Sequence, residues 1–204
     1  MVRRRSDWLV LNSIVGLLDS GVTAAPNSYE SIMTVTVGSG GQSTISFTSI
    51  PSTYKHLQIR SISRVTSSAA GSTASYGANA LLRFNSDSGA NYWWHYVLGD
   101  GSSASAGNSG SATTSLYVSD MAGPWASQTL LTYSGAVVDI LDYTSTSKTK
   151  TLRALTGQDR NGYGRVILNS GVWNSTAAIT SITMTTDGTA FEQYSTFALY
   201  GIKG

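Results

Sequence analysis

The chain closes with the stretch Tyr194-Ser-Thr-Phe-Ala-Leu-Tyr-Gly-Ile-Lys-Gly204, in which small and apolar residues alternate as in a β-strand. Successive side chains of a strand point to opposite faces of a sheet, so Phe197 and Leu199 lie on one face and Ala198 and Tyr200 on the other. A run that is apolar on both faces is typical of the inside of a sandwich rather than its rim. We therefore predict that this segment is an interior strand of a β-sandwich.

The chain from residue 29 onward has the same character, with short alternating runs separated by clusters of Gly, Ser, Asn and Asp. Strands are expected at 32–37, 43–50, 56–65, 80–84, 92–98, 114–118, 130–141, 150–155, 165–168, 179–185 and 194–202. The first two are joined by the turn signal Gly38-Ser-Gly-Gly41 and should form a hairpin. This number and spacing of strands predict an all-β fold, a jelly-roll-like antiparallel β-sandwich that occupies residues 29–204.

Two stretches have compositions that strands rarely have. Residues 67–77 and 99–113 are rich in Ser, Gly and Ala, which is typical of long loops. We expect neither to be a strand, and the second is where we expect a contact between subunits.

Residues 1–28 are predicted to form an N-terminal helical arm followed by a hinge. A helix over 6–20 would have Ser6 as its N-cap and Gly21 just past its end. Its apolar stripe at helical spacing consists of Leu11, Ile14, Val15 and Leu18. A helix of this length is marginal alone in water, so it needs a surface to lie on, either its own body or a partner.

The same region also imitates a secretory signal. Arg3, Arg4 and Arg5 precede an apolar stretch from Trp8 to Leu18. Polar residues and Gly16 interrupt that stretch, and it is far shorter than the roughly 20 residues that cross a bilayer. The docking arm is therefore the favoured interpretation, a signal peptide is the alternative, and no membrane partner is expected.

The composition excludes several classes of function. Only 12% of the 204 residues are charged, against about 25% in average globular proteins, and the net charge of +2 with no basic stripe argues against a nucleic-acid partner. Cysteine is absent, so disulfides and thiolate metal sites are excluded. A surface solvated mainly by Ser, Thr and Gly is typical of extracellular or virion proteins.

No catalytic motif is recognisable in the sequence. His56 and His95 lie in separate expected strands without a metal-binding spacing, and no nucleophile elbow is present. Asp139 and Asp142 lie three apart on an expected strand and so face opposite sides, which is wrong for a general acid and base pair. We expect no cofactor, no metal and no enzymatic activity. An enzyme would require the scattered carboxylates to converge in a cleft, the candidates being Asp100, Asp120 and Asp159.

An aromatic cluster, Asn91-Tyr-Trp-Trp-His-Tyr96, is the most prominent polar-aromatic feature. In a strand, Trp93 and His95 point one way, while Tyr92, Trp94 and Tyr96 point the other. One set must be core, and the other is a subunit interface, a sugar-stacking platform or a second inner face. The residues considered for an interface or a sugar contact are Trp93, His95, Trp125 and Trp173.

Several blocks together resemble a family of tailed-bacteriophage structural proteins that is abundant in phages of cyanobacteria and other aquatic bacteria. The blocks are Tyr29–Ile32, Ser49–Arg60, Leu82–Asn85, Val138–Tyr143, Ala177–Ile182 and Gln193–Gly204. The resemblance implies a non-enzymatic virion component with a β-sandwich body and a variable N-terminal part that selects the docking site. At Trp93-Trp94 the chain departs from the family, which has smaller or polar residues there. This departure implies a contact special to this chain.

The leading expectation is a capsid decoration or cement protein of the virion, assembled in the host bacterial cytoplasm. Its arm would dock on the major capsid protein or another virion protein through Arg3, Arg4, Arg5, Trp8, Leu11, Ile14, Val15 and Leu18. A homotrimer is expected by analogy with the three-fold sites of capsids, because a repeated arm gains avidity. The alternative is a tail or baseplate fibre or adaptor module that binds host-surface carbohydrate.

Overall fold

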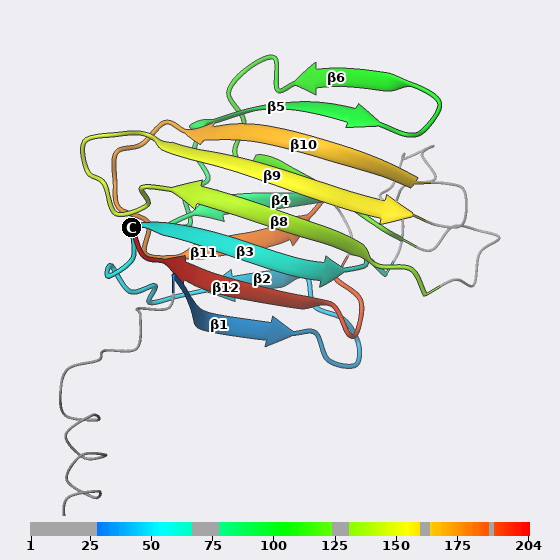
Figure 1. Cartoon of the computed structure of the whole chain (residues 1–204), viewed down its shortest axis with the longest axis horizontal. Coiled ribbons are helices and arrows are strands. Elements are labelled where there is room, and N and C mark those ends of the chain that lie inside the picture. Colours follow the sequence, from blue (N-terminus) through cyan, green and yellow to red (C-terminus); the bar gives the residue numbers. More distant parts are fainter. Residues whose placement is uncertain (1–27, 67–77, 124–130, 160–163, 188–189) are drawn as a thin grey trace, which may run out of the picture.

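A computed structural model describes residues 28–66, 78–123, 131–159, 164–187 and 190–204. The expected helix over 6–20 and the expected loop over 67–77 lie outside the described residues. Within the described ranges every regular element is a β-strand, and the strands form two antiparallel sheets (Figure 1).

The larger sheet has eight strands in the order β1-β12-β3-β8-β9-β10-β5-β6, and the smaller has four in the order β2-β11-β4-β7, both within the described part of the chain. The strands are β1 (Tyr29–Thr36), β2 (Thr44–Phe47), β3 (His56–Ser63), β4 (Ala78–Phe84), β5 (Tyr92–Gly99), β6 (Ala104–Asn108), β7 (Leu116–Met121), β8 (Ser134–Leu141), β9 (Lys150–Asp159), β10 (Gly164–Trp173), β11 (Ile182–Thr186) and β12 (Thr196–Ile202).

The strand order confirms the predicted jelly-roll-like sandwich. Strands β1-β12-β3-β8 form one half of an eight-stranded jelly roll, and β2-β11-β4-β7 form the other half. The remaining strands, β9, β10, β5 and β6, continue the larger sheet beyond that core unit. The larger sheet therefore has a broad face that is turned away from the smaller sheet, and we call it the outer face.

The predicted hairpin between residues 32–37 and 43–50 is wrong. Strand β1 pairs with β12 in the larger sheet, whereas β2 pairs with β11 in the smaller sheet. The glycine-rich stretch after β1 carries the chain from one sheet to the other, with Gly40 and Gly41 in the left-handed region at φ of 90° and 76°. A turn signal marks a change of direction, but it does not say which strands pair.

The expected absence of a strand from residues 99–113 is also wrong. Residues 104–108 form β6, which pairs with β5 at one edge of the larger sheet. A Cβ at Gly107 would lie 2.8 Å from the ring of Tyr96, so a residue without a side chain is needed where that ring covers the strand. Backbone pairing and close packing thus favour a strand in a segment whose side chains have little β propensity.

The closing segment is an interior strand, as predicted. Strand β12 lies between β1 and β3, with Phe197 and Leu199 fully buried in the core. Phe197 packs edge-on against Phe191 with ring centroids 4.8 Å apart. Gly201 lies on this inner face under the ring of Tyr54, which leaves no room for a Cβ. The sequence pattern at this strand therefore agrees with its packing, residue by residue.

Candidate functional site on the outer face of the larger sheet

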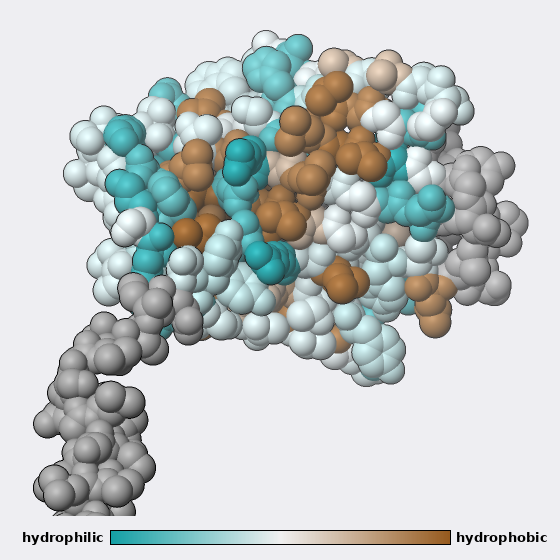
Figure 2. Space-filling model, viewed as in Figure 1, coloured by the Kyte–Doolittle hydropathy of each residue, from teal (hydrophilic) through white to brown (hydrophobic). Residues whose placement is uncertain are grey.

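Four large apolar side chains lie side by side across the outer face. Val137, Leu155, Leu168 and Val97 are direct cross-strand neighbours on β8, β9, β10 and β5. Leu155 and Leu168 are 53% and 51% exposed. We call this set the apolar row. Figure 2 shows hydrophobic side chains gathered in patches across the middle of this face, with hydrophilic side chains between them. Large apolar patches on a domain surface are typical of binding surfaces.

A second row, one pleat further along the strands, contains a hollow. Ile62 lies opposite Gly135, Gly135 lies opposite Gly157, and Gly157 lies opposite Val166. A Cβ on either glycine would have no atom within 4 Å, so the floor of the hollow is bare backbone. Ile62 and Val166, 61% and 58% exposed, are its walls. We call this set the glycine row.

The hollow has a volume of about 650 Å³ and is also bounded by Val137 and Leu155 of the apolar row. Glycine in the interior of a strand weakens it unless something approaches closely at that point. Two such glycines lie side by side on a face without a covering layer among the described residues. The arrangement is therefore suited to receive a bulky apolar side chain from outside.

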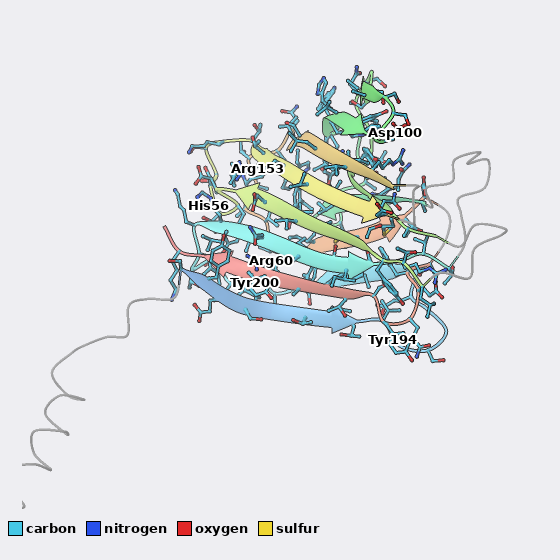
Figure 3. The ribbon with its side chains drawn as sticks, turned by 45° about the vertical axis from the view of Figure 1, so that its right-hand side comes forward. His56, Arg60, Asp100, Arg153, Tyr194 and Tyr200 are labelled. Carbon is cyan, nitrogen blue, oxygen red and sulfur yellow. The ribbon has the colours of Figure 1, made fainter. Side chains whose placement is uncertain are left out.

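Polar groups border these two rows. The Asp139 carboxylate accepts hydrogen bonds from Gln58 Nε2 at 2.7 Å and from Arg153 Nε at 2.9 Å. Arg60 lies over the rings of Tyr29 and Tyr200 at 5.4 and 5.5 Å. Figure 3 shows Arg60 and Tyr200 on the neighbouring strands β3 and β12. An apolar centre with a polar, hydrogen-bonded border is the anatomy of a protein–protein interface.

A polar hollow of about 680 Å³ adjoins the glycine row and shares Gly157 and Val166 with it. Asp100 and Asp159 both line it, together with Arg165, so two of the three scattered carboxylates do come near one another. Asp100 accepts hydrogen bonds from the backbone N–H groups of Ser103 and Ser102, at 2.7 and 2.9 Å, which lower its pKa. A turn-capping carboxylate with a lowered pKa is unsuited to act as a general acid.

Two other carboxylates considered from the sequence, Asp120 and Asp139, are not among the residues that line this hollow. Asp120 lies on β7 in the smaller sheet, opposite Asn79 of β4. Asp139 is committed to Gln58 and Arg153 on the outer face. Among the described residues no group of three or more His, Asp or Glu side chains could hold a metal ion.

Asp142 is part of an ion-pair cluster beyond the end of β8. Its carboxylate lies 2.6 Å from Lys148 Nζ and 2.9 Å from Lys55 Nζ, and its backbone N–H donates to His56 Nδ1. These lysines lower the pKa of Asp142 to about 2, from an ordinary value of 3.8. Asp139 and Asp142 were expected on the same strand with their side chains on opposite faces. This is wrong, because Asp142 lies in the turn that follows β8, at φ of 46°.

Asp142→Asn is expected to remove a pH-dependent part of the stability. Because the pKa of Asp142 is lower in the folded chain, its ionised form stabilises the fold above pH 3.8, and this contribution is lost as the pH falls through about 2. Urea unfolding from neutral pH to pH 2 measures the free energy of unfolding of the wild-type chain and of the variant. The difference between the two should be largest near neutral pH and should shrink toward pH 2. Asn keeps the tolerance for a left-handed backbone, so the comparison isolates the charge. A gap that is the same at every pH would contradict this role.

The predicted alternation around Trp93 is confirmed. Tyr92 is fully buried, and Trp94 packs against the core, whereas His95 is exposed and Trp93 is half-buried on the outer face. On the outer face of β5, His95 is next to Val97 of the apolar row, and Trp93, opposite Val172, comes after His95. These two candidates therefore belong to the border of the outer face.

Trp173 is not a contact residue, which corrects the expectation from the sequence. It is 3% exposed, and its ring packs against Phe84 and stacks on Tyr92. Its indole Nε1–H donates to Asp87 Oδ2 at 2.7 Å and lowers the pKa of that carboxyl. The inward side of β10 places it in the core. Trp125 lies outside the described residues.

A third recess, which was not predicted from the sequence, lies where the β5–β6 hairpin reaches past the smaller sheet. It has a volume of about 400 Å³ and is lined on one side by Trp94, Tyr96 and Leu98. The rings of Trp94 and Tyr96 are stacked at 6.1 Å, and both meet Tyr117 of β7 edge-on. Alternation along residues 92–96 leaves open which set of side chains is core, and it cannot show that the larger sheet extends beyond the smaller.

Comparison with known proteins adds no assignment, since no family model and no curated protein matches the chain. None of the described segments is a helix of sufficient length and apolar character to span a bilayer.

Proposed function

We propose that this chain is a structural protein of a virus particle, specifically a decoration or cement protein of a bacteriophage head, located in the virion. The observation that carries the proposal is the outer face, where an apolar centre, a bare hollow and a polar border form a surface suited to bind protein. The jelly-roll-like fold supports it, because capsid domains are among the proteins that use this fold. The fold alone would not suffice, since lectin domains use it as well.

In this proposal the sandwich covers neighbouring shell subunits, and the N-terminal arm secures it. The partner is the major capsid protein or another virion protein, and a homotrimer would multiply weak contacts into avidity. The chain acts by binding and not by catalysis, which agrees with the engaged carboxylates of the outer face.

Removal of residues 1–27 is expected to leave a folded domain that no longer attaches to particles. The core residues run from Val37 to Leu199, so thermal unfolding followed by circular dichroism should still be cooperative. Co-sedimentation with virions of the encoding phage measures attachment, and the full chain is the positive control. Attachment of the truncated chain at the level of the full chain would contradict the anchoring role.

Immunogold labelling of intact virions tests the location. Label distributed over the head supports the decoration role. Label confined to the tail would overturn it and favour the second candidate, a tail or baseplate fibre or adaptor module that binds host-surface carbohydrate. One observation supports that candidate, namely the recess lined by Trp94 and Tyr96, because half-exposed rings in a recess of this size can stack on a sugar.

A further inference from the structure

We propose that the outer face of one copy binds the N-terminal arm of another copy. The inference rests on the proposed function, because it names the partner of the same protein-binding surface. It begins from two apolar surfaces that belong to one chain. The sequence predicts an amphipathic helix over 6–20 that needs a surface to lie on. The structure supplies an apolar face that no described segment covers.

The spacing of the two surfaces agrees. A helix rises 1.5 Å per residue, so Trp8 and Leu18 of the expected helix are about 15 Å apart along its axis. The apolar row runs from Val137 to Val97 over four adjacent strands, a distance of about 14 Å. Steps of three or four helical residues cover about 4.5 to 6 Å, close to the separation of neighbouring strands. A helix that crosses the strands can thus place one apolar side chain over each strand.

The hollow in the glycine row matches the largest side chain of the arm. Ile62 and Val166 are separated by three strand spacings, about 14 Å, and only Gly135 and Gly157 lie between them. Trp8 precedes Leu11 of the stripe by three residues and is the bulkiest apolar residue of the arm. From the end of the apolar row at Val137 and Leu155 its ring can reach into the hollow that these two residues also bound. A side chain in the hollow would gain van der Waals contacts with the exposed backbone of the two glycines.

The charges of the two surfaces are also complementary. The arm begins with Arg3, Arg4 and Arg5, ahead of Trp8. The polar hollow that adjoins the glycine row contains two carboxylates, Asp100 and Asp159, and one guanidinium, that of Arg165. Three arginines next to an excess of carboxylates would guide the encounter and fix the direction of the helix.

The arm of another copy fits this face better than the arm of the same copy. The chain enters the larger sheet at β1. From Val137 toward β1, the next cross-strand neighbour in the apolar row is Arg60 of β3, and β12 and β1 lie beyond it. Arg60 is exposed and lies over the rings of Tyr29 and Tyr200. A helix that came from its own β1 would have to cross this charged residue to reach the apolar row. The arm of a neighbouring copy can approach from the other end of the row, at Val97 of β5. Copies joined in this way would form the repeated unit that the proposed function needs.

The test is a complementation experiment with two full-length double variants. The arm variant carries Leu11→Asp and Leu18→Asp, and the face variant carries Leu155→Asp and Leu168→Asp. Each variant replaces two apolar contact side chains by charged ones, so either variant alone should associate at least 100-fold more weakly than the wild-type chain. Light scattering coupled to size-exclusion chromatography measures the association. Thr34→Asp, at an exposed position of β1, is the matched control and should behave as wild type.

An equal mixture of the two variants should regain association and stop at two chains, because it contains one intact arm and one intact face. If the arm variant associates like wild type, the face binds another face and the proposal is overturned. A mixture that stays monomeric, or a wild-type chain that is monomeric throughout, would show that arms are not exchanged. If immunogold labels the phage head but light scattering shows a monomer, arm exchange alone is overturned. If light scattering shows arm exchange but the head is not labelled, the decoration role alone is overturned.

Discussion

Gly157→Val is expected to stabilise the chain and to weaken its association. A glycine inside a strand costs about 0.5 to 1 kcal/mol relative to alanine, and valine suits a strand better still. The Cβ at residue 157 would meet no atom within 4 Å, so the free energy of unfolding should rise by about that amount. The same side chain would project into the hollow between Ile62 and Val166 and exclude Trp8 of the neighbour. We expect association between copies to fall at least about 10-fold, the equivalent of about 1.4 kcal/mol.

Gly171→Val is the matched control on the inner face of the same sheet. Its Cβ would lie 2.7 Å from Leu116 Cδ2, so this variant should unfold more easily, by about 1 to 3 kcal/mol. Urea unfolding gives the stability of each variant, and light scattering gives its association. An unchanged association of Gly157→Val would exclude the hollow from the contact, whatever the stability shows.

Trp173→Ala is expected to cause the largest loss of stability, about 3 to 5 kcal/mol. The substitution empties a buried space beside Phe84 and Tyr92 and removes the hydrogen bond to Asp87. For a chain of this size the melting temperature should fall by about 10 °C. Differential scanning calorimetry of the full chain measures both quantities.

Trp93→Ala, on the outer side of β5, is the control for this core tryptophan. Its side chain is only half-buried, so its loss should cost clearly less than the loss of Trp173. Equal destabilisation by the two substitutions would mean that Trp173 is not a main anchor of the core.

The sequence predicted those features that depend on local alternation. The burial of β8 and β9 alternates along almost their whole length, and the division between Tyr92 and Trp93 follows the same period. The closing strand was predicted to be interior because both of its faces are apolar, and it is flanked by β1 and β3. Period-two patterning is set by the pleat, so it can be read without knowing which strand pairs with which.

Features that depend on pairing could not be predicted in this way. The hairpin expected around Gly38–Gly41 fails because β1 and β2 find partners far away in the sequence. The glycine row exists only because β8 and β9 pair in a register that places Gly135 beside Gly157. The strand expected over residues 165–168 stops short of Trp173, whereas β10 extends to Trp173 and places its side chain in the core. In each case the missing information is tertiary, and propensity does not contain it.

The place of β12 between β1 and β3 also constrains the synthesis of the protein. A ribosome produces β1 and β3 early, whereas β12 leaves it only after all the other described strands. Until then the nascent chain holds β1 and β3 without the strand that joins them, and each presents an open edge. Such late, long-range pairing slows folding and exposes edges to other nascent chains. Production from closely spaced ribosomes on one messenger would therefore favour mispairing, and slower translation at lower temperature should increase the soluble yield.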